Sequence, residues 1–178
     1  MSSFDLPRQR RPHDEDGDPA VRGPVLPKRV RSSRPGVRVA IFGSLPSQVR
    51  QVRAWCRSGV PVDPLRALRV ELVAGELVAN ALTHSASGQT GGRVRVEMEP
   101  LPGRLVGIAV TDDGPRVNRA LTLPYLSPQA DPLAMGGRGL RLVDRLSTRW
   151  GWEGEPGQPL TVWAHLDPYA PLPDTAGV

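Results

Sequence analysis

Apolar and polar positions follow regular spacings along most of this 178-residue chain. Residues 45–57, 64–83 and 138–146 repeat their apolar positions at helical intervals, so we expect three helices. Ser44 stands where the first of these would be capped, and Asp63, followed by a proline, stands where the second would be capped. The middle helix is the longest and the most apolar, which predicts that it lies in the core.

Five other runs alternate or stay apolar over the length of a strand. They are residues 37–42, 93–99, 105–111, 148–152 and 160–166. The order of these elements predicts an α/β fold, a two-layer sandwich with a mixed, mainly antiparallel sheet and helices on one face. The other face of such a sheet is left partly bare, which offers a surface for self-association.

Composition divides the chain into three parts. Residues 1–35 are rich in Pro, Arg and Asp and poor in apolar anchors, so we expect a disordered basic tail, most simply a dispensable extension. Residues 36–167 form the expected domain, and residues 168–178 a short C-terminal tail. Residues 1–38 hold nine Lys or Arg against five acids, so most of the net charge of +5 belongs to the tail. The nearly neutral domain does not favour nucleic acid as a partner.

The cysteine count and the absence of long apolar runs bear on the compartment. A single cysteine, Cys56, excludes an intramolecular disulfide, and its helical setting predicts a buried structural thiol. No stretch approaches the roughly 20 apolar residues of a membrane span. The N-terminus has no apolar segment of the kind found in signal peptides. We therefore expect a cytoplasmic protein with no membrane partner.

Two polar residues interrupt the apolar run at residues 70–82. Glu76 and Asn80 stand four positions apart, so they share one face of the expected helix. Burying either group without a partner is costly. Asparagine and carboxylate oxygens are ligands that suit Mg²⁺ with a bound phosphate. The pair therefore predicts a magnesium and phosphate site on this helix.

Three features later in the chain could complete a nucleotide site. Asp112 ends an apolar strand, where it could accept a hydrogen bond from an exocyclic amine, and Gly114 would let a flat base approach the backbone; an ordinary Asp-Gly turn is the alternative. Residues 136–139 open a helix whose N-terminus favours anions, and Arg138 adds positive charge. Thr161 either offers a hydroxyl near the base or is a surface strand residue.

Taken in order, these segments resemble the histidine-kinase-like ATPase superfamily, also called the GHKL or Bergerat fold. They are most similar to its anti-sigma-factor serine kinase branch. ELVANALTH resembles the N-box of that branch, TDDG its first glycine box, GGRGLRLVDRLSTRWG its second box and TVWAHL its closing strand. The resemblance covers residues 38–166. It implies the Bergerat ATP-binding fold, ATP and Mg²⁺ as cofactors, and an ATP lid at residues 115–136.

The resemblance also implies roles for single residues. Asn80 would coordinate Mg²⁺, Glu76 would act as a general base, and Asp112 would contact the adenine amine. His84 either supports the loop over the phosphates or simply ends the helix. The other positions that we assign to nucleotide binding are Gly114, Gly137, Arg138, Gly139, Leu140 and Thr161.

Departures from the family boxes bear on activity. Arg116, preceded by Pro115, replaces the second glycine of the first box, and Arg141 replaces a glycine found in many second boxes. Pro115 stiffens the lid entrance, and an arginine adopts a positive φ only at a cost. Two functions therefore stay open. One is an ATP-dependent serine/threonine kinase that is also an anti-sigma factor; the other is an ATP-binding interaction module with weak or no turnover.

The kinase interpretation implies a sigma factor and an anti-sigma antagonist protein as partners, a role in transcription regulation, and a homodimer. The ATPase domain of a sensor histidine kinase is a third interpretation. We discount it because the expected domain leaves no room for a dimerisation helix pair and His13 falls in the tail. The other histidines, His84 and His165, belong to the ATPase motifs.

Overall fold

The computed structural model describes residues 27–119, 123–126 and 138–171. Its strands are β1 (Lys28–Val30), β2 (Arg38–Gly43), β3 (Arg93–Leu101), β4 (Leu105–Thr111), β5 (Arg149–Glu153) and β6 (Thr161–Leu166). Its α-helices are α1 (Gln48–Arg57), α2 (Pro64–His84) and α3 (Arg138–Leu146). Short 3-10 turns at Ala86–Gly88 and Pro102–Arg104 follow α2 and β3.

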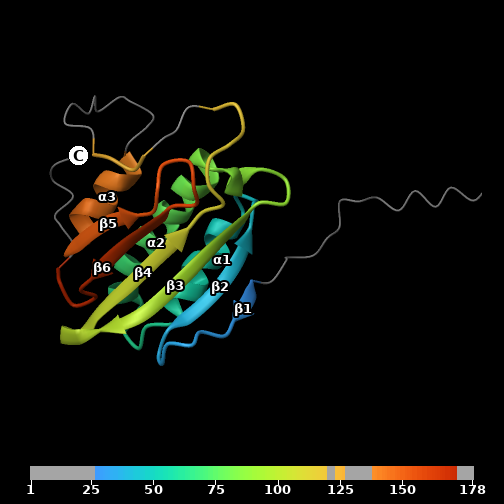
Figure 1. Ribbon diagram of the computed structural model, residues 1–178. Coiled ribbons are helices and arrows are strands. Elements are labelled where there is room, and N and C mark those ends of the chain that lie inside the picture. Colours follow the sequence, from blue (N-terminus) through green and yellow to red (C-terminus); the bar gives the residue numbers. More distant parts are fainter. Residues whose placement is uncertain (1–26, 120–122, 127–137, 172–178) are drawn as a thin grey trace, which may run out of the picture.

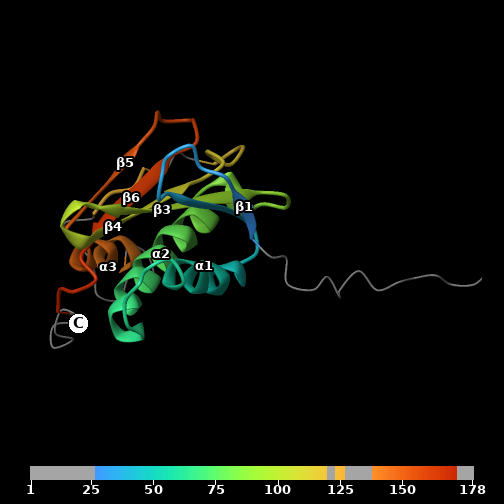
Figure 2. The same ribbon diagram turned by 90° about the horizontal axis from the view of Figure 1, so that it is seen from below.

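The strands form one sheet in the order β1-β2-β3-β4-β6-β5, and each neighbouring pair is antiparallel. All three helices lie against one face of this sheet, and the other face is open (Figure 1, Figure 2). The predicted two-layer α/β sandwich is confirmed. Among the described strands the sheet is wholly antiparallel rather than mixed.

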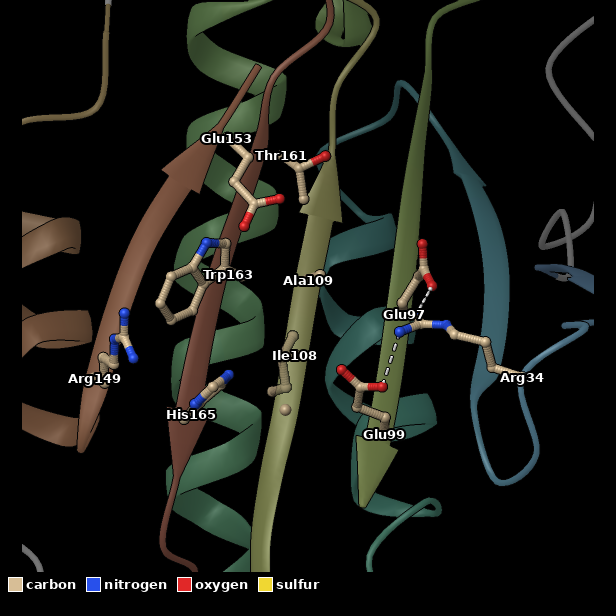
Figure 3. Close-up of a pocket in the computed structure, with 11 residues that line it drawn as sticks. Arg34, Glu97, Glu99, Ile108, Ala109, Arg149, Glu153, Thr161, Trp163 and His165 are labelled. Carbon is tan, nitrogen blue, oxygen red and sulfur yellow. Dashed lines mark hydrogen bonds and ion pairs between the residues drawn. The ribbon is translucent and has the colours of Figure 1, made fainter. Parts of the chain in front are cut away.

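Alternation along each strand separates the two faces of the sheet. In β6, Ala164 and Leu166 are fully buried and belong to the core beneath the helices. Thr161, Trp163 and His165, which alternate with the inward-facing positions of the strand, lie on the open face (Figure 3). Because successive side chains of a strand point to opposite faces, the register of β6 decides which residues can reach the helices.

Helix α2 is the centre of the core and packs against β3, β4 and β6 as well as α1 and α3. Asp63 caps it as predicted, since its carboxylate accepts a hydrogen bond of 3.1 Å from Arg66 N. Val70, Val73 and Leu77 carry its apolar face into the core. Although α2 runs for 21 residues, no helix in the described part of the chain is long and apolar enough to cross a membrane.

Two predicted boundaries are wrong. The first helix begins at Gln48, after Ser47 and not Ser44, because Gln48 N donates to Leu45 O in a preceding turn. Strand β1 lies inside the expected tail of residues 1–35. It pairs with β2 through its backbone, so it needs no apolar pattern of its own, and the sequence carried no signal for it.

Cys56 is buried in α1, as predicted for a structural thiol. Burial raises the pKa of this thiol to about 12, and the nearby charge of Arg38 only partly opposes the effect. A thiol that keeps its proton is a poor nucleophile and a poor metal ligand. Cys56 therefore serves the packing of α1 against the core.

Candidate functional site

The C-terminal half of α2 faces the first turn of α3. A Cβ on Gly139 would lie 2.8 Å from Glu76 Oε2 and 3.4 Å from Asn80 Oδ1. Both side chains therefore point at the start of α3, and a residue larger than glycine would displace the Glu76 carboxylate. Three predicted site residues are brought together here. Arg138 and Leu140 occupy the same turn, whereas Gly137 lies outside the described residues.

Asn80 carries an unsatisfied polar atom. Its Nδ2 is buried and has no hydrogen-bond partner, a state that costs about 1–3 kcal/mol. No group of three or more His, Cys, Asp or Glu able to hold a metal occurs among the described residues. Mg²⁺ in nucleotide sites takes few protein ligands and completes its shell with water and phosphate oxygens. The unsatisfied Nδ2 is a donor and cannot ligate a metal, so the amide fits a site in which Oδ1 would ligate Mg²⁺ and Nδ2 would donate to a phosphate oxygen.

The Glu76 carboxylate lies between two helices. Its Oε1 is 3.8 Å from Arg53 Nη2 of α1, and its Oε2 is the oxygen that faces Gly139 of α3. The side chain is 28% exposed, so it keeps access to solvent from one side. A carboxylate in this position can accept a proton from a hydroxyl that enters beside the phosphates.

Asp112 directly follows β4 and is fixed by backbone hydrogen bonds. Its Oδ1 accepts from Gly114 N at 2.7 Å and from Leu160 N at 3.1 Å, and its own N–H donates to Leu160 O. Gly114 has a φ of +83°, which favours glycine there. Burial raises the pKa of Asp112 more strongly than these hydrogen bonds lower it. Both bonds use Oδ1, so Oδ2 can face a ligand amine.

Arg116 attaches the segment after β4 to the end of α2. Its Nε donates to Ser85 O and its Nη2 donates to Leu82 O, both at 2.8 Å. Ala86 N adds a bond of 2.8 Å to Gly114 O. The candidate site has two parts, Asp112 with Gly114 and Glu76 with Asn80. These hydrogen bonds join the segment that carries the first part to the helix that carries the second.

The strain expected at Arg116 is not present. Among the described residues other than glycine, a positive φ occurs at Arg104 and Asn118. The chain makes its left-handed turn two residues later than the family pattern suggests. Arg116 is free to act as a cap for the last carbonyls of α2.

Two predicted residues lie away from this cluster. Thr161 Oγ1 is 2.8 Å from Thr111 Oγ1 on the open face of the sheet, on the opposite side from the helices. Leu160, one residue earlier, is the neighbour of Asp112. His84 is exposed at the last position of α2. The structure brings neither Thr161 nor His84 into contact with Glu76 or Gly139.

Sequence analysis missed Arg53 and Leu160. Leu160 contributes backbone atoms, which leave no trace in residue type. Arg53 had an indirect signal in Gly75, because a glycine inside a helix often marks a close approach of another group. A Cβ on Gly75 would lie 2.2 Å from Arg53 Nε.

Comparison with protein families agrees with this geometry. The family model described as the histidine kinase-like ATPase domain matches residues 42–162. The chain belongs to this family, and the resemblance to the GHKL superfamily is confirmed at that level. Membership in this family indicates that the chain is an ATP-binding regulatory module. No curated protein matches the chain.

Among solved structures, the chain is similar to the histidine kinase domain of a blue-light-activated histidine kinase from Erythrobacter litoralis EL346. The two share 20% sequence identity with a TM-score of 0.43. The match covers 68% of this chain and 63% of that domain, so the chain spans less than two thirds of its neighbour.

Proposed function

We propose that this chain is a cytoplasmic, ATP-dependent serine/threonine protein kinase of the anti-sigma-factor type. It binds a sigma factor and phosphorylates an anti-sigma antagonist protein, and so regulates transcription. The observation that carries the proposal is the convergence of Glu76 and Asn80 on Gly139 at the start of α3, in a chain of this ATPase family. A nucleotide binder without turnover has no evident need for a carboxylate beside the metal ligand.

The proposed mechanism divides the work between neighbouring groups. Asn80 would hold Mg²⁺, and the ion would supply positive charge to offset that of the phosphates. Glu76 would accept the proton of the incoming serine or threonine hydroxyl, or orient that hydroxyl, while the hydroxyl oxygen bonds to the γ-phosphorus and ADP leaves. The first turn of α3 presents N–H groups and the positive end of its dipole to the phosphates. The residues assigned to that turn and its approach are Gly137, Arg138, Gly139 and Leu140.

At the other end of the nucleotide, Asp112 Oδ2 would accept a hydrogen bond from the adenine amine, beside Gly114. His84, exposed at the last position of α2, either supports the loop over the phosphates or simply ends the helix. Thr161 is left out of the nucleotide site because its hydroxyl pairs with Thr111 on the opposite face of the sheet.

A second candidate is an ATP-binding interaction module that transfers no phosphate. The bonds of Arg116 to Leu82 O and Ser85 O favour it, because they anchor the beginning of the proposed lid to α2. Closure of a lid over the nucleotide often completes a catalytic site, so an anchored lid can separate binding from turnover.

For the homodimer we propose the open face of the sheet. A hollow of about 520 Å³ lies there. Figure 3 shows Arg34, Glu97 and Glu99 on one side of it and Arg149, Trp163 and His165 on the other. Trp163 Nε1 is buried without a hydrogen-bond partner. Arg34 pairs with Glu97 and Glu99 on one side, and Glu153 accompanies Arg149 on the other, so both sides carry charges of both signs; such a face can pair with a second copy of itself. Light scattering during gel filtration gives the mass that tests it.

The kinase proposal is tested by phosphate transfer. The full chain is incubated with Mg²⁺ and γ-labelled ATP, together with proteins that it captures from native extract in ATP and in ADP. Glu76→Gln should keep ATP binding and lower transfer about 100-fold or more. Glu71→Gln, at another carboxylate of α2, should change neither. ATP binding without any transfer by the unaltered chain would leave the interaction module as the function.

A further inference from the structure

Arg53 reaches from α1 across α2 to the candidate base. Its Nη2 is 3.8 Å from Glu76 Oε1, and the two side chains are 39% and 28% exposed. An exposed ion pair at this distance contributes little to stability. The position of the guanidinium, directly beside Glu76, therefore calls for another explanation.

The Arg53 guanidinium packs directly against Gly75. Glycine is the least favourable residue in a helix interior apart from proline, yet Gly75 stands in the middle of α2. A Cβ at this position would lie 2.2 Å from Arg53 Nε and 2.7 Å from Arg53 Nη2. The glycine costs helix stability and leaves room for the guanidinium.

Arg53 also has a polar atom that the fold does not satisfy. Its Nε is buried and has no hydrogen-bond partner. A charged group held partly out of water in this way is unfavourable unless it has a compensating role. The arrangement therefore gives up stability at two adjacent positions, Arg53 and Gly75, both next to Glu76.

The opposite oxygen of the carboxylate is constrained as well. Glu76 Oε2 faces Gly139, where a Cβ would lie 2.8 Å away. The carboxylate is thus flanked by a cation from α1 at one oxygen and by the first turn of α3 at the other. Both neighbouring positions require glycine to keep the present arrangement, Gly75 under the cation and Gly139 in front of Oε2.

A second ion pair between α1 and α2 shows what an ordinary contact looks like. Arg57 Nε is 3.6 Å from Glu71 Oε1, with exposures of 55% and 18%. Arg57 is not among the three atoms nearest to a Cβ built on any glycine of the described residues. Its carboxylate lies more than one helical turn before Glu76. This pair joins the same two helices and is the matched control.

We propose that Arg53, packed against Gly75, is a positioning residue for Glu76. The guanidinium holds Oε1 so that Oε2 faces the start of α3, where the phosphates and the incoming hydroxyl meet. The inference rests on the proposed function, because it assigns Arg53 to the same transfer reaction. Arg53 touches neither nucleotide nor hydroxyl in this arrangement and acts through Glu76.

The first experiment separates turnover from binding. Gly75→Ala and Arg53→Met should each lower kcat for phosphate transfer about tenfold, with ATP affinity changed less than about twofold, because only the orientation of the base is lost. Gly75→Ala should also raise Tm, since alanine favours the helix and the flexible end of Arg53 can move aside. Arg53→Lys should recover part of the rate, and Arg57→Met should leave rate and affinity unchanged.

The second experiment needs no transfer and no nucleotide. The Nε–H resonance of Arg53 is identified by its absence in Arg53→Lys. It should shift in Glu76→Gln and in Gly75→Ala, whereas the Arg57 resonance stays in place. If the unaltered chain transfers no phosphate, the proposed function fails, and this spectrum alone decides whether Arg53 and Glu76 are coupled. An unmoved Arg53 resonance, or an unchanged kcat in both variants of an active chain, overturns the inference.

Discussion

At the C-terminal end of α3, Arg69 from α2 is 5% exposed and fully engaged at its terminal nitrogens. It donates to Leu146 O at 2.7 Å, Ala170 O at 3.2 Å and Pro171 O at 2.5 Å. At the N-terminal end of α3, the buried amide nitrogen of Asn80, from the same helix, has no partner. The terminal nitrogens of one side chain of α2 are thus bonded at one end of α3, whereas the amide nitrogen of another has no partner at the opposite end.

The contrast teaches that burial alone does not distinguish a structural polar group from one that awaits a ligand. Both side chains leave water, and both would be costly without partners. The two terminal nitrogens of Arg69 recover most of that cost from three carbonyl oxygens, although its Nε is buried without a partner, whereas Asn80 Nδ2 recovers none. Other buried atoms also lack partners, among them Arg69 Nε and Trp55 Nε1, but Asn80 and Arg53 both lie close to one carboxylate: Arg53 Nη2 is 3.8 Å from Glu76 Oε1, and Asn80 faces Gly139 together with Glu76 Oε2.

The largest expected effect on stability comes from removing the Arg69 guanidinium at the C-terminal end of α3. Arg69→Met keeps the length of the side chain but leaves three carbonyl groups without their donor, so we expect a loss of about 3 kcal/mol in the free energy of unfolding. Urea unfolding measures it. ATP affinity of the folded protein should stay within about twofold, because Arg69 lies at the far end of α3. A large loss of affinity at unchanged stability would reverse the assignment of the two ends.

Removing the Asn80 amide at the N-terminal end of α3 should instead change ATP affinity and leave stability nearly unchanged. Asn80→Ala removes a group that makes no bond through Nδ2, so stability should change little, while affinity for Mg²⁺-ATP should fall about 100-fold or more, equal to about 2.7 kcal/mol. Titration calorimetry with and without Mg²⁺ checks it. Thr161→Val is the control on the open face and should leave affinity unchanged. Intact ATP affinity in Asn80→Ala would refute the metal assignment.

Asp112 is intermediate, with Oδ1 bonded to the protein and Oδ2 assigned to adenine. Asp112→Asn can keep the acceptor at Oδ1 but places a donor against the adenine amine. We therefore expect about a tenfold loss of ATP affinity, equal to about 1.4 kcal/mol. The same calorimetric titration measures it, and an unchanged affinity would remove Asp112 from the adenine site.

The same substitution has a pH signature. Burial raises the pKa of Asp112, so the folded chain holds this proton at a higher pH than the unfolded chain. This contribution to stability is present below a pH of about 4, the pKa of an unfolded aspartate, and is lost as the pH rises through the folded-state pKa. Relative to the unaltered chain, Asp112→Asn should thus gain stability as the pH rises. Urea unfolding across that range measures the difference, and a constant difference would contradict it.

Much of the fold could be predicted from local patterns. The hairpin of β3 and β4 and the Asp63 cap of α2 depend on neighbours in sequence, and periodicity reveals them. Strand β1 could not be predicted, because a three-residue edge strand depends on its partner's backbone. The start of α1 was misplaced because a turn at Leu45 delays the helix.

The candidate site was predictable where it rests on one helix and not where it depends on register or on distant contacts. Glu76 and Asn80 share a face of α2 by spacing alone. Thr161 was assigned to the wrong side of the sheet, since a shift of one residue reverses the direction of a strand side chain. The contact of Arg53 with Glu76 joins two helices, and no spacing within either helix encodes it.

The buried thiol of Cys56 has a practical consequence for studying all of these variants. It is the chain's one cysteine, and a thiol with a pKa of about 12 has almost no thiolate at neutral pH. An alkylating dye therefore reacts very slowly with Cys56 in the native protein, and the extent of labelling measures the fraction of molecules that have unfolded enough to expose it. A cysteine introduced on the surface would take up the dye alone, so distance probes can be placed on this protein without altering its core.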